Sequence, residues 1–389
     1  MKYDFETLVS RKNTGAVKWD IMYSAKPDTA DGTVPFSIAD MEFKNAPEII
    51  DGLKAYLDSS ILGYTSPTDD YYNAVIDWQT KRHGYTPKKE HILTSPGVVP
   101  AFTNAVRALT SKGDSIVFMT PAYPPFWQAG TKNSANVVEC PLIDKGDTYE
   151  IDFELFESIV SRPDVKVFIL CNPHNPVGRV WTEDELTKML DLCLEHGVYV
   201  IADEIHSDLI RPGITHTSVG TLGKKYDAIS LICTAPSKTF NLAGMQASNI
   251  IVKNASLREK LRAGGVEIGL SALGYEACRL AYVHGEAWLD ELITVLDGNF
   301  RFMRNYIEKK LPKIKMYRTE GTYLAWIDCR ALGLPADELE RLHVKHDLFL
   351  DEGYIFGKEG VGFERINIAC PRHVLADALK RMSEAYSKF

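Results

Sequence analysis

The sequence has no long hydrophobic run and no cluster of basic residues, and each absence excludes a class of protein. Nowhere do about 18 apolar residues follow one another, the length that a helix needs to cross a membrane, so we expect no membrane partner. Lys and Arg are scattered along a chain whose net charge is −8. A nucleic-acid-binding protein usually gathers them in a basic stripe, so we expect no nucleic acid partner. The first twelve residues are charged throughout and lack the apolar segment of a secretory signal, which favours the cytoplasm.

The cysteines and histidines show no spacing typical of a disulfide framework or a metal site. The seven cysteines stand alone, with no CxxC pair and no histidine cluster. Cys171, Cys193 and Cys233 lie in apolar runs, where a free cysteine acts as a small hydrophobic residue. No GxGxxG follows an apolar run and no GxxxxGK[ST] occurs, so no nucleotide fingerprint is present. We expect no disulfide and no metal.

Short apolar runs alternate with longer amphipathic stretches between residues 85 and 252. A 389-residue chain with 45% hydrophobic and 25% charged residues is typical of a globular protein with two or three domains. Most of the runs are apolar at consecutive positions, as in strands buried on both faces. The pattern predicts an α/β fold with a mostly parallel, seven-stranded sheet covered by helices. The runs span residues 91–96, 115–120, 136–141, 165–171, 198–203, 229–234 and 248–252.

The pattern changes after about residue 285. A long polar helical stretch at 286–311 precedes a mixture of short strands and helices, which predicts a smaller α+β unit. The first 45 residues lack the α/β alternation and are expected to pack with that unit. We therefore expect an N-terminal segment at 1–45, a large domain at 46–285 and a small C-terminal domain at 286–389.

Open α/β sheets bind ligands beyond the carboxyl ends of their strands, so the residues that follow each predicted strand are candidates for a site. Each has a purely structural explanation: Gly97 could only begin a helix, Asn175 could make a local turn, and Asp203 could cap a helix. Five strand ends that together supply a helix start, an aromatic ring, an amide, a carboxylate and a lysine are hard to explain by packing alone. The residues are Gly97, Tyr123, Asn175, Asp203 and Lys238.

Pyridoxal 5′-phosphate is the cofactor that needs this set of groups. It requires an amine for covalent attachment, an acid beside its pyridine nitrogen, a donor to its ring hydroxyl, a stacking ring and a phosphate cradle. Lys238 lies among small and hydroxylated residues between two apolar runs, although lysine is rarely buried unless its charge is paired or used. We therefore expect pyridoxal 5′-phosphate as the cofactor.

Three motifs in fixed order make the chain similar to a known family. NPHNPVG at 172–178, ADEIHSD at 202–208 and SKTFNLAG at 237–244 resemble the fold-type I pyridoxal-phosphate enzymes, the class I/II aminotransferase superfamily. The resemblance extends from about residue 63 to residue 372. It implies fold type I, with a large domain and a smaller C-terminal α+β domain.

The resemblance also implies a role for each matching residue. Lys238 would hold the cofactor and then act as general base at the substrate Cα, and Asp203 would keep the pyridine nitrogen protonated. Asn175 would donate to the ring O3′ and Tyr123 would stack on the ring. The phosphate would meet the backbone of Gly97, Val98 and Val99 at a helix start, with the Ser237 hydroxyl beside it.

Two further residues match the superfamily outside the central motifs. Arg365 corresponds to the arginine that binds the substrate carboxylate with its planar fork. Tyr64, in LGYT at 62–65, corresponds to a tyrosine that reaches the phosphate site of the neighbouring subunit. This implies a homodimer that acts on a small amino-acid substrate.

The chain departs from ordinary aminotransferases at three positions. Where they usually carry a tyrosine that reaches O3′, a serine and an arginine on the phosphate, this chain has His206, Ala235 and Gln246. These changes, with DEIH at 203–206 and FSIADMEF at 36–43, resemble the bacterial cystathionine β-lyase or carbon–sulfur lyase branch. That branch cleaves L-cystathionine or related L-cysteine S-conjugates to a thiol, pyruvate and ammonia, and Tyr123 would assist the proton transfer or the leaving thiolate.

Two other functions are compatible with the same residues. An aminotransferase would need a 2-oxo acid acceptor and would release no thiol. A regulatory protein could keep the site for binding with only incidental catalysis. We rank the lyase first because the intact set of Lys238, Asp203, Asn175 and Arg365 argues against an inactive site.

Overall fold

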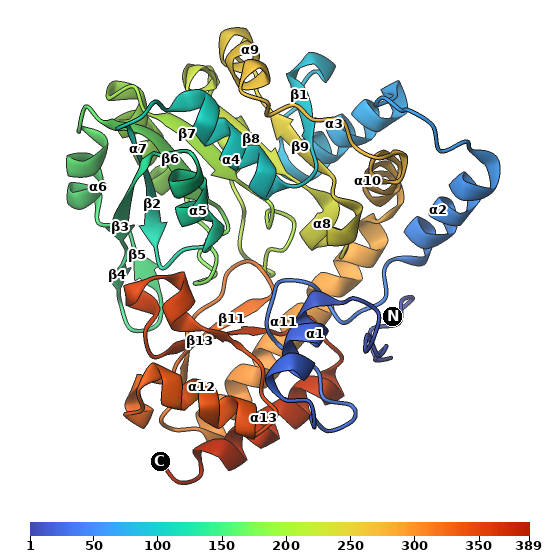
Figure 1. Cartoon of the computed structure of the whole chain (residues 1–389), viewed down its shortest axis with the longest axis vertical. Coiled ribbons are helices and arrows are strands. Elements are labelled where there is room, and N and C mark those ends of the chain that lie inside the picture. The colour runs from blue at the N-terminus through green and yellow to red at the C-terminus, as the bar shows by residue number, and fades with distance from the viewer.

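A seven-stranded sheet forms the upper part of the molecule in Figure 1, where the computed structural model describes residues 1–389. The strand order is β1-β9-β8-β7-β6-β2-β3. All neighbouring strands are parallel except that β9 runs antiparallel to β1 and β8, which confirms the mostly parallel sheet predicted from the sequence. The strands are β1 (Ile92–Ser95), β2 (Ser115–Thr120), β3 (Asn136–Pro141), β6 (Val165–Cys171), β7 (Tyr199–Asp203), β8 (Ser230–Thr234) and β9 (Ser248–Ile251).

Helices cover both faces of this sheet because successive strand side chains point to opposite faces. In β2, Phe118 packs in the hydrophobic cluster on one face, whereas Val117 packs in the cluster on the other. The first face is covered by α4 (Val98–Leu109), α5 (Pro125–Lys132) and α9 (Ala255–Ala263). The second cluster includes α2 (Pro47–Ser59), α3 (Asp69–His83), α6 (Phe153–Val160), α7 (Glu183–Glu195) and α10 (Ala272–His284).

The start of α7 shows how local sequence sets a helix boundary. Thr182 accepts a hydrogen bond from the backbone N–H of Glu185, and the Glu185 carboxylate accepts one from the backbone N–H of Thr182. This capping box satisfies two N–H groups that have no acceptor within the helix. Beyond the last turn, Gly197 takes a φ of 66°, which only glycine adopts without steric cost. The helix therefore spans the segment between these signals.

A second, antiparallel sheet lies in the lower part of the molecule (Figure 1), in the order β10-β11-β13-β12. A third hydrophobic cluster joins this sheet to α1, the second half of α11, α12 and α13. These elements are β10 (Lys315–Met316), β11 (Leu324–Asp328), β12 (Asp351–Glu352), β13 (Phe363–Asn367), α1 (Val17–Ala25), α11 (Glu286–Lys310), α12 (Ala336–Lys345) and α13 (Arg372–Tyr386). A small hairpin, β4 (Ile143–Asp144) with β5 (Tyr149–Glu150), extends from the large sheet.

The packing of α11 and of the N-terminal segment bears on the expected domains. Trp288 and Leu292, early in α11, belong to the large cluster, whereas Met303 and Ile307 belong to the small one. Within the first 45 residues, side chains such as Trp19 pack with the small sheet, and residues nearest position 45 pack with the large one. The boundaries at 45/46 and 285/286 therefore stay predictions. No helix is both long and apolar enough to cross a membrane.

Candidate active site

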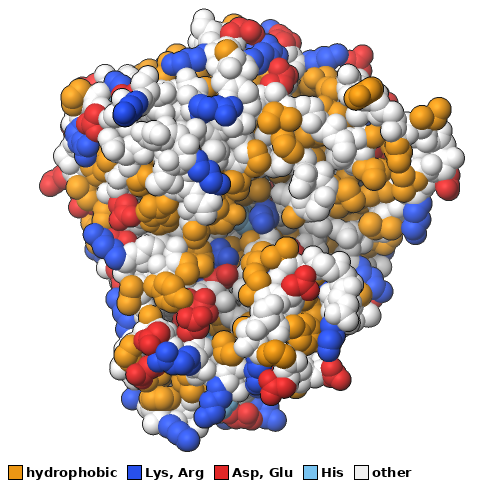
Figure 2. Space-filling model, in the orientation of Figure 1, with side chains coloured by type: hydrophobic (Ala, Val, Ile, Leu, Met, Phe, Trp, Pro, Cys, Tyr) orange, Lys and Arg blue, Asp and Glu red, His pale blue; other side chains and the backbone are white.

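A cavity of about 570 Å³ lies between the large sheet and the small antiparallel sheet. On the face in view, Figure 2 shows the molecule hollowed between its upper and lower parts. Every site residue predicted from the sequence lines this cavity except Tyr64. Those residues are Gly97, Val98, Val99, Tyr123, Asn175, Asp203, His206, Ser237, Lys238 and Arg365.

The sheet topology explains why residues far apart in sequence meet here. Two successive antiparallel pairings, β1 with β9 and β9 with β8, make β1 run in the same direction as β8. The carboxyl ends of β1, β2, β6, β7 and β8 therefore share one edge of the sheet. Asp203 is the last residue of β7, and Lys238 lies in the short helix α8 (Pro236–Thr239) that follows β8.

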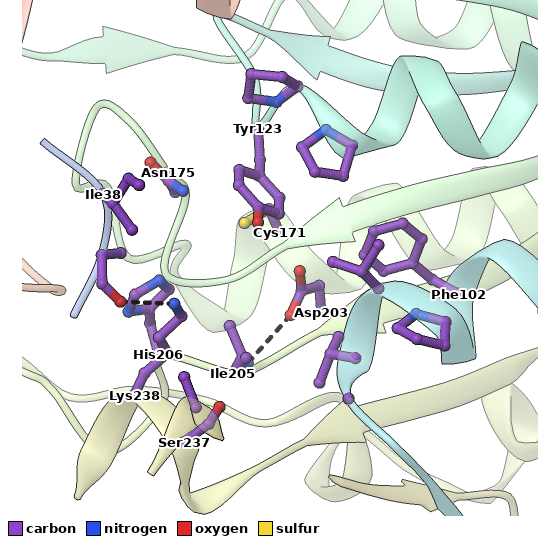
Figure 3. A pocket seen from close by; sticks show the side chains of 18 of the residues that line it. Ile38, Phe102, Tyr123, Cys171, Asn175, Asp203, Ile205, His206, Ser237 and Lys238 are labelled. Atoms are coloured by element: carbon purple, nitrogen blue, oxygen red, sulfur yellow. Dashed lines mark hydrogen bonds between the residues drawn. The ribbon is translucent and has the colours of Figure 1, made fainter. Parts of the chain in front are cut away.

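Lys238 is half-buried in the cavity wall, and its amine has one acceptor. Its Nζ donates to the carbonyl oxygen of Ala39 at 2.6 Å, a contact drawn in Figure 3. Burial lowers the pKa of this amine from 10.5 to about 8, partly opposed by the negative charge of Asp40. A substantial fraction of the amine is therefore neutral near physiological pH, the form that acts as nucleophile or base.

Asp203 lies near the centre of the cavity in Figure 3, with a side chain that is 3% exposed. Its only hydrogen bond within the chain comes from the backbone N–H of Ile205, at 3.2 Å. Burial raises the pKa of the carboxyl to about 7, although that hydrogen bond and the Lys238 charge oppose the change. The charged carboxylate thus lacks a close cationic partner, and a protonated ring nitrogen of a bound cofactor would supply one.

Arg365 is held from two sides. Its Nε and Nη2 donate to one oxygen of Asp351, at 3.1 and 2.6 Å, and its Nη1 donates to the Asn175 side-chain oxygen at 2.8 Å. Because Asn175 uses its oxygen for this bond, its amide N–H groups are the ones left to donate into the cavity.

Tyr123 and His206 are both uncharged at neutral pH. Burial raises the pKa of the Tyr123 phenol above its ordinary value, so the group is a hydrogen-bond donor. Burial, followed by the charges of Lys238 and Arg365, lowers the pKa of His206 well below its ordinary value. The Nδ1 atom of His206 is buried without a hydrogen-bond partner.

The end of the cavity near α4 suits an anion. Gly97 takes a φ of 120° before the first turn of α4, a backbone conformation that strongly favours glycine. The Gly97 N–H donates to the backbone carbonyl oxygen of Ser95 at 2.7 Å, and its expected contact with a phosphate stays a prediction. The N–H groups of Val98 and Val99, at the helix start, lack intrahelical acceptors and remain for an anion. Ser237 and Gln246 line the same cavity.

This donor set fits pyridoxal 5′-phosphate. A partly neutral amine, a buried carboxyl without a cation and a helix start with free N–H groups line one cavity. Figure 3 shows Tyr123 and Ser237 on opposite sides of Asp203. Each group that the cofactor needs is therefore present within the chain.

Tyr64 is the one predicted residue outside the cavity. It lies in the segment after α2, its side chain is fully exposed, and several apolar neighbours are exposed with it. These are Leu57, Ile61 and Leu62, and Figure 2 shows hydrophobic side chains gathered near α2. Its role at a neighbouring subunit's site stays a prediction.

The cavity lining also includes residues that the sequence did not predict, among them Ile38, Ala39, Asp351 and Phe356. Ala39 contributes a backbone carbonyl, which no side-chain pattern can identify. Asp351 and Phe356 come from the small sheet region and Ile38 from the N-terminal segment, so they reach the cavity through contacts between distant parts of the chain. The sequence held two signals for these residues: Ile38 and Ala39 lie in the FSIADMEF motif at 36–43, and Asp351 is an acidic residue fourteen positions before Arg365.

Comparisons with known proteins agree with this geometry. The chain is 41% identical to cystathionine β-lyase PatB of Bacillus subtilis (strain 168) over 389 residues, covering 99% of this chain and all of PatB. Its structure is similar to that of cystalysin from Treponema denticola, which contains a pyridoxal 5′-phosphate cofactor, with a TM-score of 0.98, 44% identity and complete coverage of both chains. It is also similar to a PLP-bound C-S lyase from Staphylococcus hominis, with a TM-score of 0.92, 32% identity and 99% of each chain covered.

The family model for aminotransferase class I and II matches residues 32–382, which include all three motifs and Arg365. This confirms the family predicted from the motifs. The chain belongs to the aminotransferase class I and II family.

Proposed function

We propose that the chain is a pyridoxal-phosphate-dependent carbon–sulfur β-lyase that converts L-cystathionine or a related L-cysteine S-conjugate, with water, to a thiol, pyruvate and ammonia. The observation that carries this proposal is the Lys238 amine with its lowered pKa, which shares one cavity with Asp203 and Arg365. The names of the full-length relatives, a cystathionine β-lyase and a C-S lyase, support the same reaction.

The cofactor-binding residues follow from the cavity lining. Lys238 attaches the cofactor, Asp203 holds the proton on its pyridine nitrogen, and Asn175 donates to its ring hydroxyl. Tyr123 stacks on one face of the cofactor ring. The neutral His206, which lines the same cavity, also contacts this ring. The N–H groups of Val98 and Val99, with Ser237, bind the phosphate.

Three side chains of the chain bind the substrate, remove its proton and protonate the leaving group during the elimination. Pyridoxal 5′-phosphate, when bound, draws electrons away from the substrate Cα and so makes its proton removable. Arg365 binds the substrate α-carboxylate, and the freed Lys238 amine takes the Cα proton. Tyr123, protonated at neutral pH, donates its hydroxyl proton toward the departing sulfur.

The distribution of charge favours a lyase over an aminotransferase that uses a dicarboxylic 2-oxo acid. The lysine and arginine side chains that line the cavity are Lys238 and Arg365, and Arg365 is already paired with Asp351. A second carboxylate on an acceptor would therefore enter without a free cation from this chain, at a large desolvation cost. Gln246 places a neutral amide where the superfamily usually has a phosphate arginine.

We further propose that the enzyme is a cytoplasmic homodimer. The exposed Tyr64 and its apolar neighbours form a surface suited to a second copy, in which Tyr64 would reach the phosphate end of the neighbouring cavity. All seven cysteines are free and buried, as expected in a reducing compartment.

The reaction is tested by incubating the cofactor-loaded protein with L-cystathionine in the absence of any 2-oxo acid. We expect pyruvate and free thiol in equal amounts over many turnovers. A single turnover that converts the cofactor to its amine form, with cycling restored only by a 2-oxo acid, would instead identify an aminotransferase. Bound cofactor with neither reaction would favour a binding role.

A further inference from the structure

The contact between Asp351 and Arg365 is built into the register of the small sheet. β12 and β13 are antiparallel, and Asp351 lies directly opposite Arg365. Residues opposite each other in such a pair point to the same face, and here that face is the cavity wall. The next pair, Glu352 and Glu364, points to the other face. Asp351 and Arg365 are 8% and 4% exposed, so the pair is largely removed from water.

Asp351 occupies one particular edge of the Arg365 fork. A single Asp351 oxygen accepts hydrogen bonds from Nε and Nη2, which together form the side edge of the guanidinium. The ring of Phe356 lies against the guanidinium, 4.6 Å from its centroid to the arginine Cζ. Of the five N–H donors of an arginine, one on Nη1 and one on Nη2 remain after the bonds to Asp351 and Asn175. The plane and edge of the fork are therefore defined before any substrate arrives.

We infer that Asp351 is a positioning residue that sets both the orientation of Arg365 and its affinity for the substrate carboxylate. This inference rests on the proposed role of Arg365 in binding that carboxylate. By holding the side edge, Asp351 directs the remaining donors toward the cavity, where they meet a carboxylate in a fixed geometry. By its negative charge, it also weakens the attraction between Arg365 and an incoming anion.

The same Asp351 oxygen also accepts the backbone N–H of Ile38 at 3.0 Å. Ile38 lines the cavity and takes a φ of 54°, an unusual conformation for a β-branched residue. Asp351 therefore joins the carboxylate-binding arginine to the N-terminal wall of the cavity. Replacement by asparagine keeps an acceptor oxygen for these contacts and removes only the charge, whereas alanine removes both.

The experiment compares Asp351→Asn and Asp351→Ala in the cofactor-loaded protein, with Glu352→Gln as the matched control on the other face of the same strand. Calorimetry gives the dissociation constant of propionate, a carboxylate without a reacting group, and steady-state assays with L-cystathionine give kcat and KM. We expect Asp351→Asn to lower the propionate dissociation constant and KM by about threefold to tenfold with little change in kcat. We expect Asp351→Ala to lower kcat by about tenfold or more, because the fork is no longer held.

A structural role alone would change the melting temperature but would not separate KM from kcat in this way. The inference is overturned if Asp351→Asn weakens propionate binding, or if Asp351→Ala keeps the kcat of the unmodified protein. If the unmodified protein releases no pyruvate and thiol, the proposed lyase function fails. The dissociation constants of propionate for the unmodified protein and for Asp351→Asn still test whether Asp351 sets the affinity of Arg365 for a carboxylate. Glu352→Gln should match the unmodified protein in all three constants.

Discussion

The ε-amine of Lys238 lies 2.6 Å from the carbonyl oxygen of Ala39, which comes from the N-terminal segment and also accepts the Tyr323 hydroxyl at 2.9 Å. Beside Ala39, the buried Lys18 amine bridges Asp40 and Glu42 at 2.9 and 2.6 Å. The ion pairs with the buried Lys18 hold the carboxylates of Asp40 and Glu42 in place. The N-terminal segment therefore forms part of the active-site wall and is more than an extension of the small sheet.

Replacement of Lys238 by alanine should abolish the covalent attachment of the cofactor and almost all lyase turnover. The variant lacks both the attaching amine and the proposed base, and loss of a general base alone costs about 10²- to 10⁴-fold. Absorbance spectra of the purified protein and pyruvate release from L-cystathionine measure the two effects. A Lys238→Ala protein that kept the absorbance of the covalent cofactor would contradict the site assignment.

The pH profile of kcat should report the lowered pKa of Lys238. A base must be neutral to take a proton, so the rate should rise with pH below the pKa and level off above it. Burial lowers this pKa from 10.5 to about 8, which places the plateau above about pH 8 instead of above pH 10. Rates measured from pH 6 to 10 test this. A rate that still rises tenfold per pH unit at pH 9 would show that the amine keeps its ordinary pKa.

Replacement of Asp203 by alanine should leave a protein that binds the cofactor but removes the Cα proton slowly. Without the carboxylate, the proton on the pyridine nitrogen loses its partner, and the cofactor draws electrons less strongly from the substrate. We expect kcat to fall by about 10²-fold or more. Solvent exchange of the substrate Cα proton, followed by NMR, isolates this step. Near-normal exchange in the variant would refute the role given to Asp203.

The strand ends and their motifs could be predicted from the sequence because each depends on local pattern. The carboxyl ends of parallel strands must share an edge, so Asp203 and Lys238 could be placed together before the structure was known. The partner of Arg365 could not, since it depends on the register of β12 against β13, strands only two and five residues long that are joined by an irregular segment. The Ser95 acceptor that engages the Gly97 N–H is a backbone atom in a tight turn and leaves no mark in side-chain patterns.

Replacement of Tyr123 by phenylalanine should slow thiol release more than proton removal. The change keeps the ring against the cofactor and deletes only the hydroxyl, whose raised pKa makes it a proton donor at neutral pH. We expect lyase kcat to fall by about tenfold to 100-fold while Cα proton exchange continues. A Tyr123→Phe enzyme with full lyase turnover would show that another group serves the leaving sulfur.

Glu204, next to Asp203 but hydrogen-bonded to Ser218 and the Val219 N–H, should make stability depend on pH. Burial raises its pKa from 4.5 to about 7, so the folded state favours the protonated acid. The contribution of this carboxyl to stability is therefore present below pH 4.5 and lost as pH rises through about 7. Glu204→Gln has no titratable group, keeps an acceptor oxygen for the Val219 N–H, and offers its amide N–H to the Ser218 hydroxyl oxygen. Urea unfolding should give Glu204→Gln a free energy of unfolding higher than that of the unmodified protein by on the order of 1–3 kcal/mol at pH 8. This difference in the free energy of unfolding should become smaller toward pH 5. A constant difference across this range would mean that the Glu204 carboxyl is not what titrates.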